Sequence, residues 1–225
     1  MTDGKRATNP LFQRTFHIKD QGECKALYKD WATTYDATMV DELAYLAPQT
    51  VVSVLANHLA DKQASILDLG CGTGLVGESL QRLGFDAIDG VDFSQEMLNV
   101  AQGKNLYRRL IQADLTAATD LPSEEYDAAI SAGLFTYGHL DAQCLGEIFR
   151  TIKPGGLFVS AIRRPIWEEY GFQAQFADWE ENQQVKILSK ELANNYSNVE
   201  NNDGVYLVAQ KLKEWSVRGT REQDS

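Results

Sequence analysis

The sequence is poor in the residues that mark disulfide-rich and metal-binding proteins. It contains three cysteines and three histidines among 225 residues. The cysteines are odd in number and widely separated, so they predict no disulfide framework, and neither residue type occurs at a metal-ligand spacing. We therefore expect a protein of a reducing compartment that holds no metal ion.

Long apolar runs are missing as well. No stretch of about 18 consecutive apolar residues occurs, and residues 1–9 contain no hydrophobic segment of the kind that directs secretion. We therefore expect a cytoplasmic protein without a membrane partner.

Positive charge is also scarce. The chain has 21 Lys and Arg against 32 Asp and Glu, a formal net charge of −11 and a pI of about 4.7. Arg108-Arg109 and Arg163-Arg164 are pairs rather than patches. Because an acidic chain repels a phosphate backbone, we do not expect nucleic acid as a partner or substrate.

Short apolar runs alternate with amphipathic segments along the middle of the chain. Five runs predict strands, at 65–69, 87–91, 106–112, 126–132 and 157–162. Because helices separate them, they predict an α/β fold with a doubly wound, mostly parallel sheet. The runs at 185–188 and 205–209 flank an Asn-rich connection and predict an antiparallel pair that closes one edge of a seven-stranded sheet.

The most informative stretch is Ile66-Leu67-Asp68-Leu69-Gly70-Cys71-Gly72-Thr73-Gly74. It predicts a buried strand that leads through a glycine turn into a helix from Leu75 to Leu83. Glycines at alternate positions let a ligand approach the backbone, because they carry no Cβ. Such a turn places backbone N–H groups and a helix N-terminus against a nucleotide-like ligand.

Two features of this turn argue against a dinucleotide. Leu75 occupies the position of the third glycine in the dinucleotide pattern G-x-G-x-x-G. Asp68 would also place a negative charge near a pyrophosphate. Both features suit a ligand with a positively charged amine and sulfonium, and an NAD-dependent oxidoreductase remains a distant alternative.

Further motifs follow the glycine turn in order: Gly90-Val91-Asp92-Phe93-Ser94-Gln95-Glu96-Met97-Leu98, Ala113-Asp114-Leu115, Tyr126-Asp127 and Lys153-Pro154-Gly155-Gly156. Together they resemble the class I S-adenosylmethionine-dependent methyltransferases over about residues 20–162. The entry segment from Tyr28 to Asp36 and the late strand from Gly204 to Val208 are similar to the methyltransferase-like (Williams–Beuren region) branch. The resemblance implies a Rossmann-like methyltransferase fold with S-adenosyl-L-methionine as cofactor.

On this basis we expect a single methyltransferase domain over residues 1–225. The expected parts are a loose arm (1–16), an N-terminal helical cap (20–61), a cofactor-binding core (64–162), a substrate-side segment with the closing strands (163–216) and a tail (217–225).

The resemblance implies cofactor contacts along the motifs. Asp92 could accept hydrogen bonds from both ribose hydroxyls, or merely place a negative charge at a helix N-terminus. Asp114 could accept from the adenine amine or act as an N-cap. Asp68 could bind the amino group, directly or through water. The expected cofactor-binding residues are Tyr28, Tyr35, Asp68, Gly70, Cys71, Gly72, Gly74, Asp92, Phe93, Met97, Ala113, Asp114, Leu115 and Ser131. In this set Phe93 and Met97 would cover the adenine, and a tyrosine at 28 or 35 could cover the cofactor or simply pack.

In this family the segment after the fourth strand usually holds the methyl acceptor. The expected substrate-binding residues are Phe135, Tyr137, His139, Arg163 and Trp167. His139 or Tyr137 could act as a general base, and His139 matches neutral pH better, although it could instead cap or pack near a helix. An arginine would suit a carboxylate substrate.

The Asn-Pro-Pro-Tyr signature of base and amide N-methylators is missing, because the fourth strand leads into Ser131-Ala132-Gly133-Leu134. We therefore expect a methyltransferase that acts on a small-molecule acceptor by in-line displacement. The alternative is a subunit that holds the cofactor and catalyses nothing. No residue pattern indicates an oligomeric state.

Overall fold

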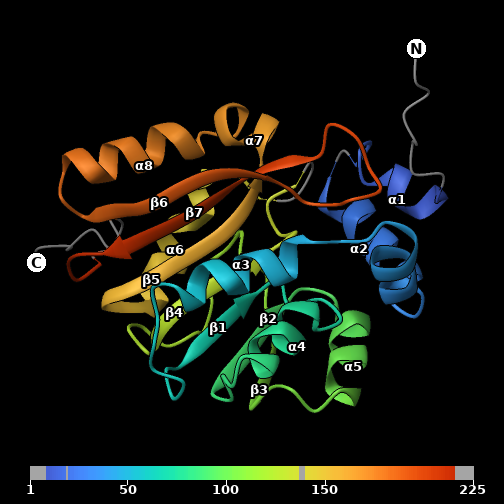
Figure 1. Cartoon of the computed structure of the whole chain (residues 1–225), viewed down its shortest axis with the longest axis horizontal. Helices are drawn as coiled ribbons and strands as arrows, with labels where there is room; N and C mark the ends of the chain where they lie inside the picture. Colours follow the sequence, from blue (N-terminus) through green and yellow to red (C-terminus); the bar gives the residue numbers. More distant parts are fainter. Residues whose placement is uncertain (1–8, 19, 137–139, 216–225) are drawn as a thin grey trace, which may run out of the picture.

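A central seven-stranded sheet organises the molecule (Figure 1). The computed structural model describes residues 9–18, 20–136 and 140–215. The strands are β1 (Ile66–Leu69), β2 (Ile88–Asp92), β3 (Arg109–Gln112), β4 (Tyr126–Ala132), β5 (Ile152–Arg163), β6 (Val185–Asn194) and β7 (Asp203–Lys211). Their order across the sheet is β3-β2-β1-β4-β5-β7-β6.

The pairing of the strands confirms the predicted fold class. Strands β1 to β5 are parallel to one another, β7 runs antiparallel to β5, and β6 runs antiparallel to β7. Every residue of β1 and β2 is buried, because helices cover both faces of the sheet. Strands buried on both faces are typically continuous apolar runs rather than alternating patterns; β1 departs from this at Asp68, and β2 at Asp89 and Asp92.

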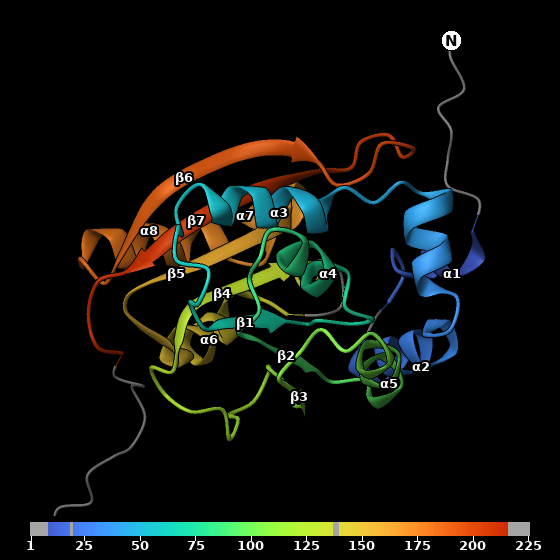
Figure 2. The same ribbon diagram turned by 60° about the horizontal axis from the view of Figure 1, so that its bottom comes forward.

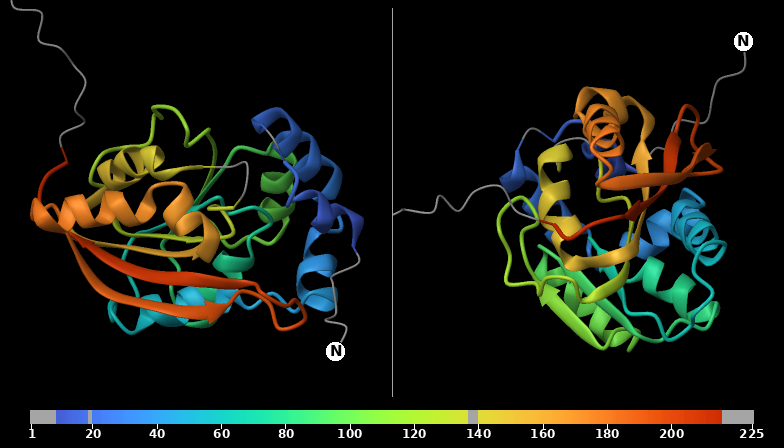
Figure 3. Two further views of the ribbon diagram at one scale, coloured as in Figure 1. Left: turned by 90° about the horizontal axis from the view of Figure 1, so that it is seen from above. Right: turned by 90° about the vertical axis from the view of Figure 1, so that its left-hand side faces the viewer.

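The helices lie in two layers and at one end of the sheet. They are α1 (Pro10–Arg14), α2 (Gln21–Trp31), α3 (Ala47–Ala56), α4 (Leu75–Arg82), α5 (Gln95–Gly103), α6 (Leu145–Thr151), α7 (Arg164–Glu169) and α8 (Phe172–Glu181), with short helical turns η1 (Ala37–Glu42) and η2 (Ala142–Cys144). Helices α3 and α4 pack on one face of the sheet and α6 to α8 on the other (Figure 3). Helices α1, α2 and α5 lie near the carboxyl ends of the strands (Figure 2).

The structure corrects the expected loose arm at residues 1–16. Pro10 stands in the first turn of α1, and the Asn9 side chain caps the helix by accepting hydrogen bonds from the backbone N–H groups of Leu11 and Phe12. Phe12 is buried against α2 and η1. The capping signal was present in the sequence, but the polar composition of the segment obscured it; residues 1–8 lie outside the described ranges.

The segment after β5 also differs from the expectation. The sequence pattern predicts no helix between β5 and β6, whereas the structure has α7 and α8 there. Phe172, Phe176 and Trp179 follow one another at helical spacing, and all three are buried against the sheet. The expected tail from residue 217 lies outside the described residues. No helix within the described ranges is long and apolar enough to cross a membrane.

Candidate functional site

The glycine turn between β1 and α4 has a backbone conformation that requires glycine. Gly70, Gly72 and Gly74 have φ angles of +64°, +53° and +97°, in the left-handed region that strains other residues. A Cβ on Gly72 would meet nothing closer than the Gly70 carbonyl oxygen at 4.0 Å, so it would project into open space. That space is where a ligand can approach the backbone.

Asp92 connects this turn to the end of β2. Its Oδ2 accepts a hydrogen bond from the Gly72 backbone N–H at 2.9 Å, and its Oδ1 accepts one from the Ser94 N–H at 2.8 Å. Burial raises the pKa of the Asp92 carboxyl to about 6, although the backbone N–H donors oppose this shift. A carboxylate has about four lone-pair sites, so both oxygens can still accept from a ligand.

Two adjoining pockets of about 410 Å³ each open at this edge of the sheet, and Gly70, Asp92, Phe93 and Leu134 line both. The Met97 pocket is completed by Tyr28, Tyr35, Gly72, Met97, Ala132 and Gly133. The Asp114 pocket is completed by Cys24, Ala113, Asp114, Leu115, Thr116 and Leu140. The structure thus brings ten of the expected cofactor residues together: Tyr28, Tyr35, Gly70, Gly72, Asp92, Phe93, Met97, Ala113, Asp114 and Leu115.

The other four expected cofactor residues do not line these pockets. The Cys71 side chain is buried against Gly90, and Gly74 packs against Leu106 and Tyr107. Ser131 is fully buried in β4, where it pairs with Ser160 of β5. These side chains support the turn and the sheet from within.

Asp68, the fourth of these residues, lies beneath the turn. Its Oδ2 accepts a hydrogen bond from the Tyr107 hydroxyl at 2.7 Å, while its buried Oδ1 makes no hydrogen bond with the described residues. Burial raises the pKa of the Asp68 carboxyl to about 7. A partly satisfied buried carboxyl so close to a ligand site is a common mark of function.

Tyr107 supports the turn from below, and no motif in the sequence predicts this role. A Cβ on Gly77 would lie 2.5 Å from its hydroxyl oxygen, so the glycine in α4 makes room for this tyrosine. We expect Tyr107→Phe to lower the free energy of unfolding by about 1–3 kcal/mol at pH 8, because the ionised Asp68 loses a donor. The loss should be smaller at pH 5, where Asp68 is protonated.

Urea unfolding at both pH values measures this effect. Tyr206→Phe is the matched control, because the Tyr206 hydroxyl donates to the neutral Asn195 amide at 3.0 Å. The loss of stability that Tyr206→Phe causes should not depend on pH. An equal loss at both pH values for Tyr107→Phe would contradict the assigned contact.

Asp36 connects the N-terminal segment to the glycine turn. Asp36 Oδ1 accepts from the Thr73 hydroxyl at 2.5 Å, and Asp36 Oδ2 binds Lys104 Nζ at 2.6 Å. Lys104 also binds Glu78 Oε1 at 2.6 Å. These contacts hold the segment that carries Tyr28 and Tyr35 over the carboxyl edge of the sheet.

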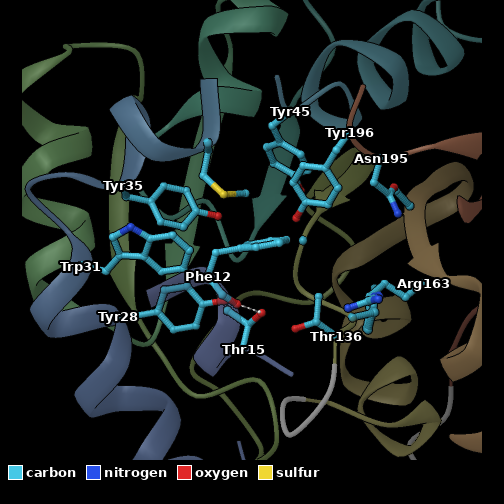
Figure 4. Close-up of a pocket in the computed structure, with 14 residues that line it drawn as sticks. Phe12, Thr15, Tyr28, Trp31, Tyr35, Tyr45, Thr136, Arg163, Asn195 and Tyr196 are labelled. Atoms are coloured by element: carbon cyan, nitrogen blue, oxygen red, sulfur yellow. Dashed lines mark hydrogen bonds between the residues drawn. The ribbon is translucent and has the colours of Figure 1, made fainter. Parts of the chain in front are cut away.

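A third pocket of about 550 Å³ lies beside the Met97 pocket and shares Tyr28, Tyr35 and Gly133 with it (Figure 4). We call it the aromatic pocket. Its lining is Phe12, Thr15, Tyr28, Trp31, Tyr35, Met39, Tyr45, Gly133, Phe135, Thr136, Ala161, Arg163, Asn195 and Tyr196. Burial raises the pKa values of Tyr28, Tyr35 and Tyr45 well above their usual range, so these phenols are neutral at physiological pH.

The expected substrate residues are only partly brought together. Phe135 and Arg163 line the aromatic pocket. Trp167 is instead buried in the core, where its ring stacks 5.8 Å from that of Phe176. Tyr137 and His139 lie outside the described residues. Among the described residues no group of His, Cys, Asp and Glu could hold a metal ion.

Several pocket residues were not expected from the sequence. Phe12 comes from α1, Tyr45 precedes α3, and Asn195 and Tyr196 follow β6. The Tyr45 and Tyr196 rings stack at 4.8 Å although 150 residues separate them in the chain. The one sequence signal was the Asn-rich connection. There the Asn195 side-chain amide donates to the Asn202 carbonyl oxygen, and the Asn202 side-chain oxygen accepts from the Tyr196 backbone N–H.

Comparison with known proteins gives a consistent result. A family described as "Methyltransferase domain" matches residues 66–156. Human methyltransferase-like protein 27 is 39% identical over 144 residues, which cover 62% of this chain and 58% of the human protein. A demethylmenaquinone methyltransferase of Leptospira interrogans is 36% identical over 103 residues, which cover 42% of this chain and 41% of that protein. The chain thus matches about two fifths to three fifths of the length of these relatives.

A solved structure with the same fold is the methyltransferase in a complex with the Trm112 methyltransferase activator of Haloferax volcanii. It superposes with a TM-score of 0.63 at 16% identity and covers 86% of this chain and 98% of that one. At this identity the likeness concerns the fold, a Rossmann-like sheet with its helices.

Proposed function

We propose that the chain is a class I S-adenosylmethionine-dependent methyltransferase, which its similarity to the methyltransferase domain family and to human methyltransferase-like protein 27 supports. It transfers the methyl group of that cofactor to a small-molecule acceptor bound in the aromatic pocket. One observation carries this proposal. The Met97 pocket and the aromatic pocket share Tyr28, Tyr35 and Gly133, so molecules bound in the two pockets would face each other.

The first two pockets fit the cofactor. Gly72 leaves its backbone open to the methionine part, and Asp92 would accept hydrogen bonds from the ribose hydroxyls. Asp114 would accept from the adenine amine, and Phe93 and Met97 would cover the adenine ring. When bound, the cofactor supplies the electrophilic methyl group, so the chain needs no electrophile of its own.

The residues of the aromatic pocket would bind and orient the acceptor. Neutral, partly buried tyrosines and apolar side chains would exclude water from the point where the two pockets meet. Holding two reactants in line can lower a barrier by about 7–11 kcal/mol. Orientation is thus the main contribution that this site can make to methyl transfer.

The lining of the pocket and the charge of the chain favour a small acceptor. Seven of the fourteen described lining residues are aromatic, and small-molecule sites are lined mostly by apolar and aromatic side chains. The acidic chain disfavours nucleic acid. The name of the Leptospira relative also refers to the methylation of a small molecule.

Calorimetry with S-adenosylhomocysteine, followed by a screen of small acceptors for methyl transfer, tests this proposal. We expect binding of the cofactor product and turnover of at least one acceptor. Absence of binding would refute the cofactor assignment. Binding without turnover across the screen would instead favour a silent cofactor-binding subunit.

A further inference from the structure

The aromatic pocket has one charged side chain among its described lining residues, and that side chain is the guanidinium of Arg163. No described aspartate or glutamate lines the pocket, and the phenols of Tyr28, Tyr35 and Tyr45 are neutral because burial raises their pKa values. The pocket is therefore positive at one place and uncharged elsewhere.

A second polar group lies beside this charge. The hydroxyl oxygen of Thr136 is buried and makes no hydrogen bond with the described residues, although it lines the pocket. Thr136 and Arg163 lie next to each other, on the side of the pocket opposite Tyr28, Trp31 and Tyr35 (Figure 4). A buried hydroxyl costs free energy unless it finds a partner, and an acceptor oxygen of a ligand would be such a partner.

Seven of the fourteen described lining residues are aromatic. Phe12, Tyr45 and Tyr196 lie between the two sides of the pocket (Figure 4), and the Arg163 guanidinium itself lies 4.8 Å from the centre of the Phe16 ring. Flat rings favour a flat ligand through stacked or edge-to-face contacts. The charge at one side and the cofactor pocket at the other define the two ends of that ligand.

We infer that the acceptor is an aromatic carboxylate, with its carboxylate on Arg163 and Thr136 and its methylated atom at the opposite end, beside Tyr28 and Tyr35. Arginine suits this role because its planar donors match the two oxygens of a carboxylate. The inference rests on the proposed function, since it takes the aromatic pocket as the acceptor site.

Three probes of one shape test the inference. 4-Hydroxybenzoate, 4-hydroxybenzamide and 4-hydroxybenzylamine place an anion, a neutral group or a cation opposite the same hydroxyl. Their dissociation constants are measured by ligand-observed NMR on the full chain saturated with S-adenosylhomocysteine. We expect the carboxylate to bind at least about tenfold more tightly than the amide, as a charged hydrogen bond predicts. Tightest binding of the amine or the amide, or no binding of the carboxylate, would overturn the inference.

Arg163→Gln should weaken the carboxylate about tenfold and change the amide less than about threefold, whereas Arg163→Lys should retain part of the affinity. Arg164→Gln is the matched control, because the adjacent Arg164 is exposed and pairs with Asp203 at 2.9 Å. It removes the same charge and should change neither probe. An Arg163→Gln variant that binds the carboxylate as the wild type does would overturn the inference.

Affinity for S-adenosylhomocysteine separates the possible failures. Arg163 lines neither cofactor pocket, so its variants should bind this compound as the wild type does, which also shows that they fold. If S-adenosylhomocysteine does not bind to the wild type, the proposed function fails. If a neutral acceptor is methylated while carboxylates are refused, the proposed function stands and this inference alone is wrong.

Discussion

Replacing Asp92 with alanine is expected to raise the dissociation constant for S-adenosylhomocysteine by about 100-fold or more. Each hydrogen bond between a hydroxyl and a carboxylate contributes about 1.5–3 kcal/mol, and Asp92 would make two to the ribose. Two such losses amount to about 3–6 kcal/mol, which corresponds to a factor of about 10² to 10⁴. Titration calorimetry measures this change.

The Asp92 side chain also accepts from the backbone N–H groups of Gly72 and Ser94, so the variant must be shown to keep its turn. Asp92→Asn retains one acceptor oxygen and should lose less affinity than Asp92→Ala. Asp86→Ala is the charge-matched control, because Asp86 is exposed and stands just before β2. Unchanged affinity in a folded Asp92→Ala variant would remove Asp92 from the ribose site.

The parts of the site that were predictable are the parts encoded locally. Gly70, Gly72, Asp92 and Asp114 each stand at or just after the end of a strand, and parallel strands end at the same edge of the sheet. These four residues could therefore be assigned to one edge of the sheet from the local sequence alone, without knowing how the helices and strands pack.

The direction of a side chain was harder to predict than its chemistry. Asp68 is predicted to bind the cofactor, directly or through water. In the structure one oxygen of its carboxyl accepts from Tyr107, 39 residues away, and the other makes no hydrogen bond with the described residues. Trp167 was expected at the mouth of the site, but it stands on the face of α7 that packs against Phe176. Residue spacing does not determine which neighbouring element a side chain meets.

The aromatic pocket was the least predictable feature, because it forms only after the chain folds. Phe12, Tyr45 and Tyr196 come from three separate segments, and none of these segments carries a motif. These segments come together through contacts between distant residues. One example is the pair of Phe12 and Tyr196 rings, whose centres lie 5.4 Å apart. Phe135 and Arg163 could be expected as acceptor residues, from their positions after β4 and at the end of β5. Tyr28 and Tyr35 were expected at the site, but only as a cover for the cofactor.

Asp68→Asn is expected to stabilise the cofactor-free protein at alkaline pH relative to the wild type. Burial raises the pKa of Asp68 from its usual value near 4 to about 7. The protonated carboxyl therefore favours the folded state, and this contribution is fully present below about pH 4 and is lost as the pH rises through 7. Above pH 7 the wild type must keep a charged carboxylate in its interior.

The expected size of this effect follows from the shift. Three pKa units correspond to about 4 kcal/mol, so the stability of the variant minus that of the wild type should rise by about 3 kcal/mol between pH 5 and pH 8. The new amide N–H₂ group is buried without a known acceptor and costs about 1–3 kcal/mol at both pH values. Urea unfolding at the two pH values removes this constant cost from the comparison.

Asp127→Asn is the control, because the pKa of Asp127 is lowered rather than raised. Hydrogen bonds from Lys153 and Ser65 lower the pKa of Asp127 despite its partial burial. Its stabilising contribution is thus present above its usual pKa and is lost only as the pH falls through the lowered value. The Asp127→Asn variant should lose stability at pH 5 and pH 8 alike. A pH-independent difference for Asp68→Asn as well would mean that Asp68 is already ionised in the folded protein at pH 5, so that its pKa is not raised, as it would be if water reached its free oxygen.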